Sequence, residues 1–211
     1  MVVRHPVKVM VGGSSPSRGV KISFTIGRQS RLCWMRDMNQ IQTMVFKAIC
    51  RWVVNNPDLP LMMGKGSPVK FNLPNLIAHY SLANEFYYST DKSHQFLVEN
   101  NFFDENGYVA RRSKKNQPLT WEHAIPCNLI GKYFLEHHND LNQERVEEVL
   151  ESANKVVILT REEDNLLGKN LRCNMPSGWK MFEDSWLARY EEVGIIVNQD
   201  KTVLMKNKTY R

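Results

Sequence analysis

The fold class is decided by the stretch Lys155-Val156-Val157-Ile158-Leu159-Thr160-Arg161-Glu162-Glu163. Residues 155–159 form a mostly apolar run that is typical of a buried strand. Thr160 and Glu163 stand at the spacing of a capping box, in which each side chain binds a backbone N–H group left free at the N-terminus of a helix. A strand that runs directly into a capped helix predicts a domain of the α+β class.

Further elements are expected on both sides of this stretch. Apolar residues recur at helical spacing in residues 37–54, 75–87, 91–101, 126–138, 141–153 and 183–193. Alternating or short apolar runs predict two pairs of strands, closed by polar loops, at residues 7–11 with 20–26 and at 195–197 with 202–204. We therefore expect a mainly helical domain with a short antiparallel hairpin near each terminus.

The length and composition suit a single domain. The chain has 211 residues, of which 42% are apolar, enough to bury a core. The segment 57–74 holds four prolines and two glycines and is expected to be an irregular connection. It is the candidate for an internal boundary, and no internal repeat is evident. We expect residues 1–211 to form one domain.

The charge of the chain indicates a nucleic acid as partner. The formal net charge is +6 and the pI is about 9.1. Four cations lie close together, at Arg111, Arg112, Lys114 and Lys115. Such a cluster suits the phosphates of a nucleic-acid backbone, and the alternative is a solvated loop. We expect these four residues to bind nucleic acid, DNA in preference to RNA.

The cysteines and the hydropathy indicate a cytoplasmic protein. Cys33, Cys50, Cys127 and Cys173 include no closely spaced pair, so neither a zinc ribbon nor a disulfide framework is expected. Reduced thiols fit a reducing compartment. No apolar run approaches the roughly 18–20 residues of a membrane span, and the N-terminal apolar stretch is too short for a signal peptide. We therefore expect no membrane partner.

The residues with the clearest chemistry lie in Thr120-Trp121-Glu122-His123-Ala124-Ile125-Pro126. Hydrolysis of a phosphodiester needs a base that activates water and a cation that neutralises the transition state. A neutral imidazole can be that base near pH 7, and a carboxylate oxygen is a suitable ligand for Mg²⁺. Adjacent residues of an extended segment point in different directions, so Glu122 and His123 can serve different partners.

These seven residues resemble the first motif of the HNH, or ββα-metal, nucleases, in which an acidic residue or His precedes a His and a Pro follows. The resemblance is limited to residues 120–170. It implies that Glu122 is a metal ligand and that His123 is the general base, the two acting as a catalytic pair. It also implies a ββα-metal-like element, in which a second strand leads into a helix that supplies the last ligand, here Asp164 or Asn165. The implied cofactor is Mg²⁺ or Mn²⁺.

The chain departs from the family motif in two respects. The two proposed strands are separated by residues 124–154, which are read as two helices, whereas the family motif is more compact. The later Asn and His of the motif are missing from their usual places. Asn128 and Asn154 are the candidates for the central Asn.

Two functions follow from these residues. The first is a metal-dependent, HNH-like endonuclease that hydrolyses nucleic acid, which would be a homodimer if it cuts palindromes. The alternative is a non-catalytic nucleic-acid-binding protein, or a protein inhibitor of a nucleic-acid enzyme, in which Glu122 meets the dipole of a helix N-terminus and His123 makes an ordinary hydrogen bond. An open cleft shared by Glu122, His123 and Asp164 would favour the enzyme, and burial in ordinary contacts far from another carboxylate would favour the binding protein.

Overall fold

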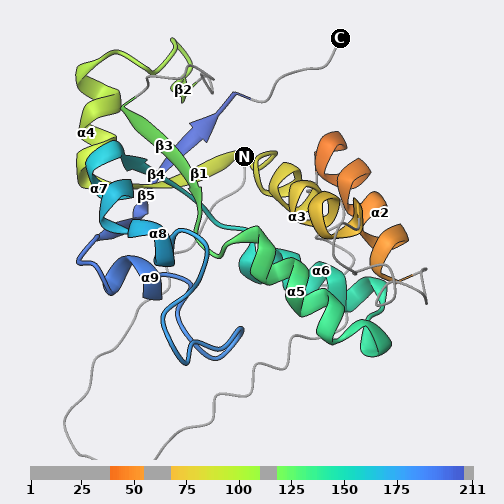
Figure 1. Ribbon diagram of the computed structural model, residues 1–211. Coiled ribbons are helices and arrows are strands. Elements are labelled where there is room, and N and C mark those ends of the chain that lie inside the picture. Colours follow the sequence, from red (N-terminus) through yellow and green to blue (C-terminus); the bar gives the residue numbers. More distant parts are fainter. Residues whose placement is uncertain (1–38, 55–67, 110–117, 207–211) are drawn as a thin grey trace, which may run out of the picture. The chain divides into compact units, whose positions relative to one another are not determined.

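The computed structural model describes residues 39–54, 68–109 and 118–206 (Figure 1). The hairpin expected at residues 7–11 and 20–26 lies outside the described residues, and so does the basic cluster of residues 111–115. The described part contains helices and a sheet, which confirms the α+β class. With a five-stranded sheet in it, a mainly helical character is not confirmed. None of the helices described is long and apolar enough to cross a membrane.

The described strands form one mixed sheet in the order β2-β5-β1-β4-β3 (Figure 1). They are β1 (Phe86–Thr90), β2 (Tyr108–Val109), β3 (Leu119–His123), β4 (Val156–Thr160) and β5 (Val197–Met205). The neighbours β1 and β4 are parallel, and each has an antiparallel partner on its other side, β5 beside β1 and β3 beside β4. The edge strand β2 is parallel to β5. The four strands β5-β1-β4-β3 therefore have the same pattern of directions when read from either side.

The described helices fall into two groups. Four of them share one hydrophobic cluster: α2 (Gln40–Val53), α3 (Pro68–Ser81), α5 (Cys127–Glu136) and α6 (Gln143–Ala153). The others follow strands or lie near the sheet: α4 (Asp91–Glu99), α7 (Arg161–Leu166), α8 (Gly168–Leu171) and α9 (Ala188–Glu191). The 3₁₀ helix η2 (His138–Asp140) connects α5 with α6. The helices expected at 37–54, 91–101, 126–138 and 141–153 thus correspond to α2, α4, α5 and α6.

Among the described residues, three hydrophobic clusters make up the core. The first fills the four-helix group, where Ile77 and Phe134 are fully buried. The second lies on the face of the sheet that α4 covers and contains Val156. The third lies on the opposite face and contains Val157 and Tyr190. Because β4 buries alternate side chains on two covered faces, its first four residues, 156–159, are all apolar.

A helix–strand–helix unit occurs twice in the part of the chain that the structure describes. The units are α3–β1–α4 and α6–β4–α7. Matching residues 83–97 with 153–167, a shift of 153 − 83 = 70 positions, aligns identical residues in Ala83/Ala153, Asn84/Asn154, Thr90/Thr160 and Leu97/Leu167. Leu97 lies in the second cluster, whereas Leu167 lies in the third cluster, on the opposite face of the sheet. A twofold axis along the parallel strands would relate the units in this way.

Hydrogen bonds join the two units at both ends of their strands. At one end Asn154 Nδ2 donates to Asn84 Oδ1 at 2.8 Å, and Asn84 Nδ2 donates to the Asn154 carbonyl oxygen at 3.1 Å. At the other end Thr90 Oγ1 donates to Glu163 Oε2 at 2.9 Å. Glu163 also belongs to the capping box of Thr160 at the start of α7, as the sequence predicts. The cap of one unit is therefore tied to the cap of the other.

The helix expected at residues 75–87 is wrong at both ends. The observed helix α3 starts at Pro68 and includes Pro74, so part of the segment expected to be irregular is helical. Proline suits the first position of a helix, because the N–H group that it lacks has no partner there. Residues 86–87 belong to β1, where Phe86 lies opposite Leu204 of β5. Pairing with this distant strand overrides the local apolar spacing.

One strand replaces the hairpin expected near the C-terminus. The two segments expected to pair with each other both pair with β1, since Val197 lies opposite Thr90 and Thr202 lies opposite Tyr88. The register shifts between Tyr88 and Ser89. Residues 199–201 therefore form an irregularity within β5, and their polar, exposed side chains resemble those of a turn. Near it, the helix expected at 183–193 is reduced to the single turn α9 and adjoining turns.

Candidate functional site

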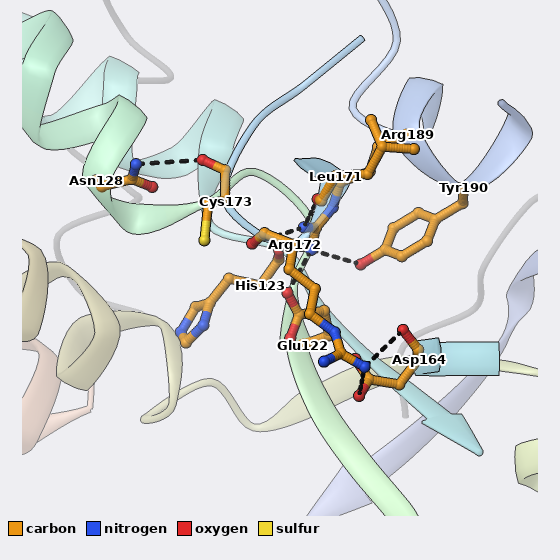
Figure 2. A network of polar contacts seen from close by, with 9 residues as sticks. All are labelled: Glu122, His123, Asn128, Asp164, Leu171, Arg172, Cys173, Arg189 and Tyr190. Carbon is orange, nitrogen blue, oxygen red and sulfur yellow. Dashed lines mark hydrogen bonds and ion pairs between the residues drawn. The ribbon is translucent and has the colours of Figure 1, made fainter. Parts of the chain in front are cut away.

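The antiparallel pair β3–β4 carries the residues of the Glu-His motif. Glu122 lies opposite Val157, and His123 lies opposite Val156. Val157 belongs to the cluster on one face of the sheet and Val156 to the cluster on the other. Because side chains alternate along a strand, Glu122 and His123 leave β3 on opposite faces, and Figure 2 shows them diverging. The two residues expected to act together are therefore on different sides of the strand.

Glu122 is held by a buried arginine. Arg189 Nη2 donates to Glu122 Oε1 at 2.8 Å, and the Arg189 side chain is fully buried whereas that of Glu122 keeps 21% of its surface exposed. The same guanidinium donates to the main-chain carbonyl oxygens of His123 and, at 2.7 Å, of Leu171. Its Nη2 also reaches the hydroxyl of Tyr190 at 3.3 Å. Arg189 thus fixes the end of β3 against the segment that follows α7 (Figure 2).

A second ion pair lies on α7 and the end of α8. Arg172 Nη2 donates to Asp164 Oδ2 at 2.9 Å and to Asn165 Oδ1 at 3.1 Å. The Arg172 side chain is 41% exposed and that of Asp164 is 16% exposed. Asp164 and Asn165, the two candidates for the last metal ligand, are thus brought together on one partly exposed arginine.

The two ion pairs interact as one electrostatic cluster. Burial raises the pKa of the Glu122 carboxyl above its ordinary value, and the charge and hydrogen bond of Arg189 oppose this rise. The Asp164 carboxylate adds to the rise in the Glu122 pKa, and Arg172 opposes it. Helix α7, which carries Asp164, packs against strand β3, which carries Glu122. Two carboxylates separated by 164 − 122 = 42 positions thus come from elements in contact.

The groups around this cluster stay neutral near pH 7. Burial raises the pKa of the Cys127 thiol to about 12, and the Glu122 carboxylate adds to that shift. Burial also raises the pKa of the Tyr190 hydroxyl above its ordinary value, although Arg189 opposes the change. A thiol is an effective nucleophile only as the thiolate. Nucleophilic catalysis by Cys127 or Tyr190 is therefore not expected.

The oxygens of Glu122, Asp164 and Asn165 are of the kind that binds Mg²⁺ or Mn²⁺. Magnesium is commonly held by one or two carboxylates, with water and substrate phosphates as its other ligands. The described residues include no group of three or more His, Cys, Asp or Glu side chains that could hold a metal. A metal at this place would therefore rest on two carboxylates and an amide, and it would compete with the guanidinium groups for their oxygens.

The two candidates for the central Asn of the motif make structural contacts. Asn154 precedes β4 and bonds with Asn84. It lies near the end of β3, since the N–H group of Ala124 donates to the carbonyl oxygen of Lys155 at 2.8 Å. Asn128 of α5 donates from Nδ2 to the carbonyl oxygen of Cys173 at 3.2 Å (Figure 2).

Sequence reasoning missed both arginines of this site. Arg189 lies in a segment whose neighbours Leu187 and Tyr190 are apolar, and a lone cation among such residues was the signal available. Arg172 has no local signal, because its partners Asp164 and Asn165 are identified only by how the chain turns after α7. The basic cluster of residues 111–115 lies outside the described part of the chain.

Comparisons with protein families, with curated proteins and with solved structures found no match to this chain. The resemblance of residues 120–126 to a nuclease motif therefore rests on those residues alone. The function has to be argued from the contacts described above.

Proposed function

We propose that the protein is a metal-dependent nuclease that hydrolyses phosphodiester bonds in nucleic acid. The observation that supports this proposal is the packing of α7 on β3, which brings Asp164 and Asn165, both bonded to Arg172, to the strand that carries Glu122. An antiparallel strand pair, β3–β4, followed by a helix that packs on it, α7, is also the arrangement that the HNH resemblance implies. We also propose that the enzyme is cytoplasmic, that it prefers DNA as its substrate and that it forms a homodimer.

Each charged residue has a proposed task at this site. Glu122, Asp164 and Asn165 would hold Mg²⁺ or Mn²⁺, which when bound neutralises charge on the phosphate and activates water. Arg189 is a positioning residue, because its hydrogen bonds fix the Glu122 carboxylate. Of the two arginines of the site, Arg172 is the exposed one, and its guanidinium suits a substrate phosphate.

The remaining proposed tasks concern the base and the backbone of the substrate. His123 is proposed as the general base, although its imidazole leaves β3 on the face opposite to Glu122. Arg111, Arg112, Lys114 and Lys115 are proposed to bind the phosphate backbone. The role of His123 is the part of the mechanism that a single variant tests most directly.

The test is cleavage of plasmid DNA and of total RNA with Mg²⁺, with Mn²⁺ or with EDTA. Asp164→Asn and His123→Ala are compared with Glu162→Gln, a matched control at an exposed carboxylate of α7, and thermal melting verifies that each variant folds. We expect cleavage that needs metal and falls at least about a hundredfold in the first two variants, because loss of supporting groups alone costs ~10–100-fold. Cleavage in EDTA, or an unchanged rate in Asp164→Asn, would contradict the proposal.

A second candidate is a nucleic-acid-binding protein without catalysis. It is favoured by the ion pair between Glu122 and Arg189 and by the divergence of Glu122 from His123. Such a protein would bind nucleic acid with an affinity that falls steeply as salt increases. A folded protein that binds but cleaves neither polymer with either metal would establish this candidate in place of the nuclease.

A further inference from the structure

Three oxygens of α7 converge on a single nitrogen of Arg172. Its Nη2 donates to Asp164 Oδ2 at 2.9 Å, to Asn165 Oδ1 at 3.1 Å and to the main-chain carbonyl oxygen of Asp164 at 3.1 Å. Carboxylate, amide and main-chain oxygens are the ligands that hard divalent cations take in proteins. The guanidinium therefore uses the oxygens that a cation bound to Asp164 and Asn165 would need, and Figure 2 shows it on the Asp164 carboxylate.

The path of the chain after α7 brings Arg172 to these oxygens. The two partners are separated by 172 − 164 = 8 positions, which is about 12 Å along a continuous helix. An unbroken helix would thus hold the guanidinium away from the main chain of Asp164. Gly168 interrupts it between α7 and α8 with a φ of 57°, in the left-handed region that glycine adopts without strain. The turn at Gly168 therefore returns Arg172 to α7.

The two arginines of the site differ in how firmly they are held. Arg189 is fully buried and bonds to Glu122 and to main-chain carbonyl oxygens of other segments. Arg172 is 41% exposed, and its side-chain hydrogen bonds within the described residues all go to Asp164 and Asn165. An exposed ion pair adds little to stability. Arg172 can therefore leave its partners at small cost, whereas Arg189 cannot.

The charges of the site favour a cation only after Arg172 has left. Two ion pairs, Glu122 with Arg189 and Asp164 with Arg172, sum to zero charge. Departure of the Arg172 guanidinium leaves one net negative charge and frees the side-chain oxygens of Asp164 and Asn165. A divalent cation is attracted to the site in that state and opposed by the guanidinium in the other. The released guanidinium can in turn bind a phosphate through two hydrogen bonds.

We propose that Arg172 is an autoinhibitory contact that alternates between two partners. In the free protein it occupies the oxygens of Asp164 and Asn165, and in the complex it binds a phosphate of the nucleic acid. Binding of the phosphate removes the competitor from the metal ligands and so raises the affinity of the site for Mg²⁺ or Mn²⁺. The inference rests on the metal ligands and the substrate of the proposed function and adds how that site is regulated.

The first test is titration calorimetry with Mn²⁺ alone, without nucleic acid. Arg172→Met should bind Mn²⁺ about tenfold more tightly than the wild type, because a unit charge a few ångströms away opposes a divalent cation by roughly that factor. Lys169→Met is the matched control, since it removes an exposed cation of α8 and leaves the contacts of Arg172 in place. The gain should disappear in the double variant Arg172→Met with Asp164→Ala. Thermal melting verifies that each variant folds.

The second test needs no metal and measures the phosphate partner. A short labelled DNA duplex is titrated in EDTA and followed by fluorescence anisotropy. Asp164→Ala should bind DNA about threefold more tightly than the wild type, because it releases Arg172 from an exposed ion pair. Glu162→Ala removes the same charge from an exposed position of α7 and should give a smaller gain. The gain of Asp164→Ala should disappear when Arg172→Met is added.

The inference is overturned if Arg172→Met binds Mn²⁺ no more tightly than the wild type or than Lys169→Met. It is also overturned if Asp164→Ala gains no more DNA affinity than Glu162→Ala, or if its gain persists without Arg172. The cleavage assay separates these results from the proposed function. Both gains in affinity without cleavage by the wild type retain the inference and remove the nuclease. Metal-dependent cleavage with an unchanged Mn²⁺ affinity in Arg172→Met does the reverse.

Discussion

The two helix–strand–helix units share the residues before and after their strands and differ in the side chains at the start of the second helix. In α3–β1–α4 and in α6–β4–α7 an Asn precedes the strand and a Thr caps the helix that follows. The third residue of that helix is Ser93 in the first unit and Glu163 in the second. The next position is His94 in the first unit and Asp164, the partner of Arg172, in the second. The shared Asn and Thr residues fix the backbone before and after each strand. Asp164 of the candidate site lies at a position where the two units differ in sequence.

The strands of the two units differ in the same way. β4 lies between β1 and β3, and its first four residues are buried on both faces. β1 leaves Phe86 44% exposed, whereas the corresponding Val156 is 1% exposed. The second unit therefore contributes Asp164 and Asn165 to the candidate site, whereas the first leaves Phe86 exposed on its strand. The predictions below concern the candidate site and the contacts that join the two units.

The largest effect is expected from Arg189 of α9, which holds Glu122 of the candidate site. Arg189→Met removes the partner of Glu122 and donors to two main-chain carbonyl oxygens. Removing one member of a buried ion pair costs about 3–5 kcal/mol of unfolding free energy. Urea unfolding measures this loss. Arg172→Met is the matched control, since its side chain is 41% exposed and exposed pairs contribute about 0–1 kcal/mol. Equal losses of unfolding free energy in the two variants would contradict the assignment of Arg189 to a buried, stabilising ion pair.

The next effect concerns the caps. Glu163→Ala removes an acceptor used by the Thr90 hydroxyl and by the Thr160 N–H group, both at 2.9 Å. We expect a loss of about 2–3 kcal/mol, because a hydrogen bond to a charged group contributes ~1.5–3 kcal/mol. Ser93→Ala, the equivalent change in the first unit, removes a neutral hydroxyl that accepts from the Thr90 N–H group and donates to the Ile158 carbonyl oxygen. It should cost about 1–2 kcal/mol, because a hydrogen bond between neutral groups contributes ~0.5–1.5 kcal/mol. Chemical denaturation compares them, and a larger loss in Ser93→Ala would mean that the caps are not joined through Glu163.

A smaller effect measures the contact between the units at the other strand ends. Asn84→Ala removes both hydrogen bonds between the two residues, whereas Asn154→Ala removes only the one that its Nδ2 donates, since the other is accepted by the main-chain carbonyl oxygen of residue 154. A double-mutant cycle should give a coupling of about 1 kcal/mol, within the range of residues that share a hydrogen-bond network. The two single variants and the double variant are unfolded in urea under the same conditions. Additive losses would show that the two Asn side chains stabilise their units independently.

The smallest effect is a pH dependence specific to Glu122. Burial raises the pKa of its carboxyl in the folded protein above the ordinary value, so folding favours the protonated form. The resulting contribution to stability is full below the ordinary carboxyl pKa and is lost as the pH rises through the higher pKa of the folded state. The difference in unfolding free energy between wild type and Glu122→Gln should therefore fall as the pH rises from acid toward neutral. A rising difference would mean that Arg189 outweighs burial.

The candidate site was predicted in part. The sequence identified Glu122 by its place beside His123, and it identified Asp164 and Asn165 by their place on the capped helix α7. It did not identify Arg189 or Arg172, because an arginine becomes part of a site only through partners that folding brings to it. It also did not show that Glu122 and His123 leave β3 on opposite faces, which follows from the pairing of β3 with β4.

The sequence by itself determined where half of the described α-helices lie and where α7 starts, because capping and apolar spacing act between residues a few positions apart. The cap of Thr160 by Glu163 and the helices α2, α4, α5 and α6 are of this kind. Only the tertiary structure decided that residues 86–90 form a strand and that residues 197–205 form one strand in place of a hairpin. A strand is stabilised by the neighbour that it pairs with, and here β1 and β5 are joined across 197 − 90 = 107 positions of the chain.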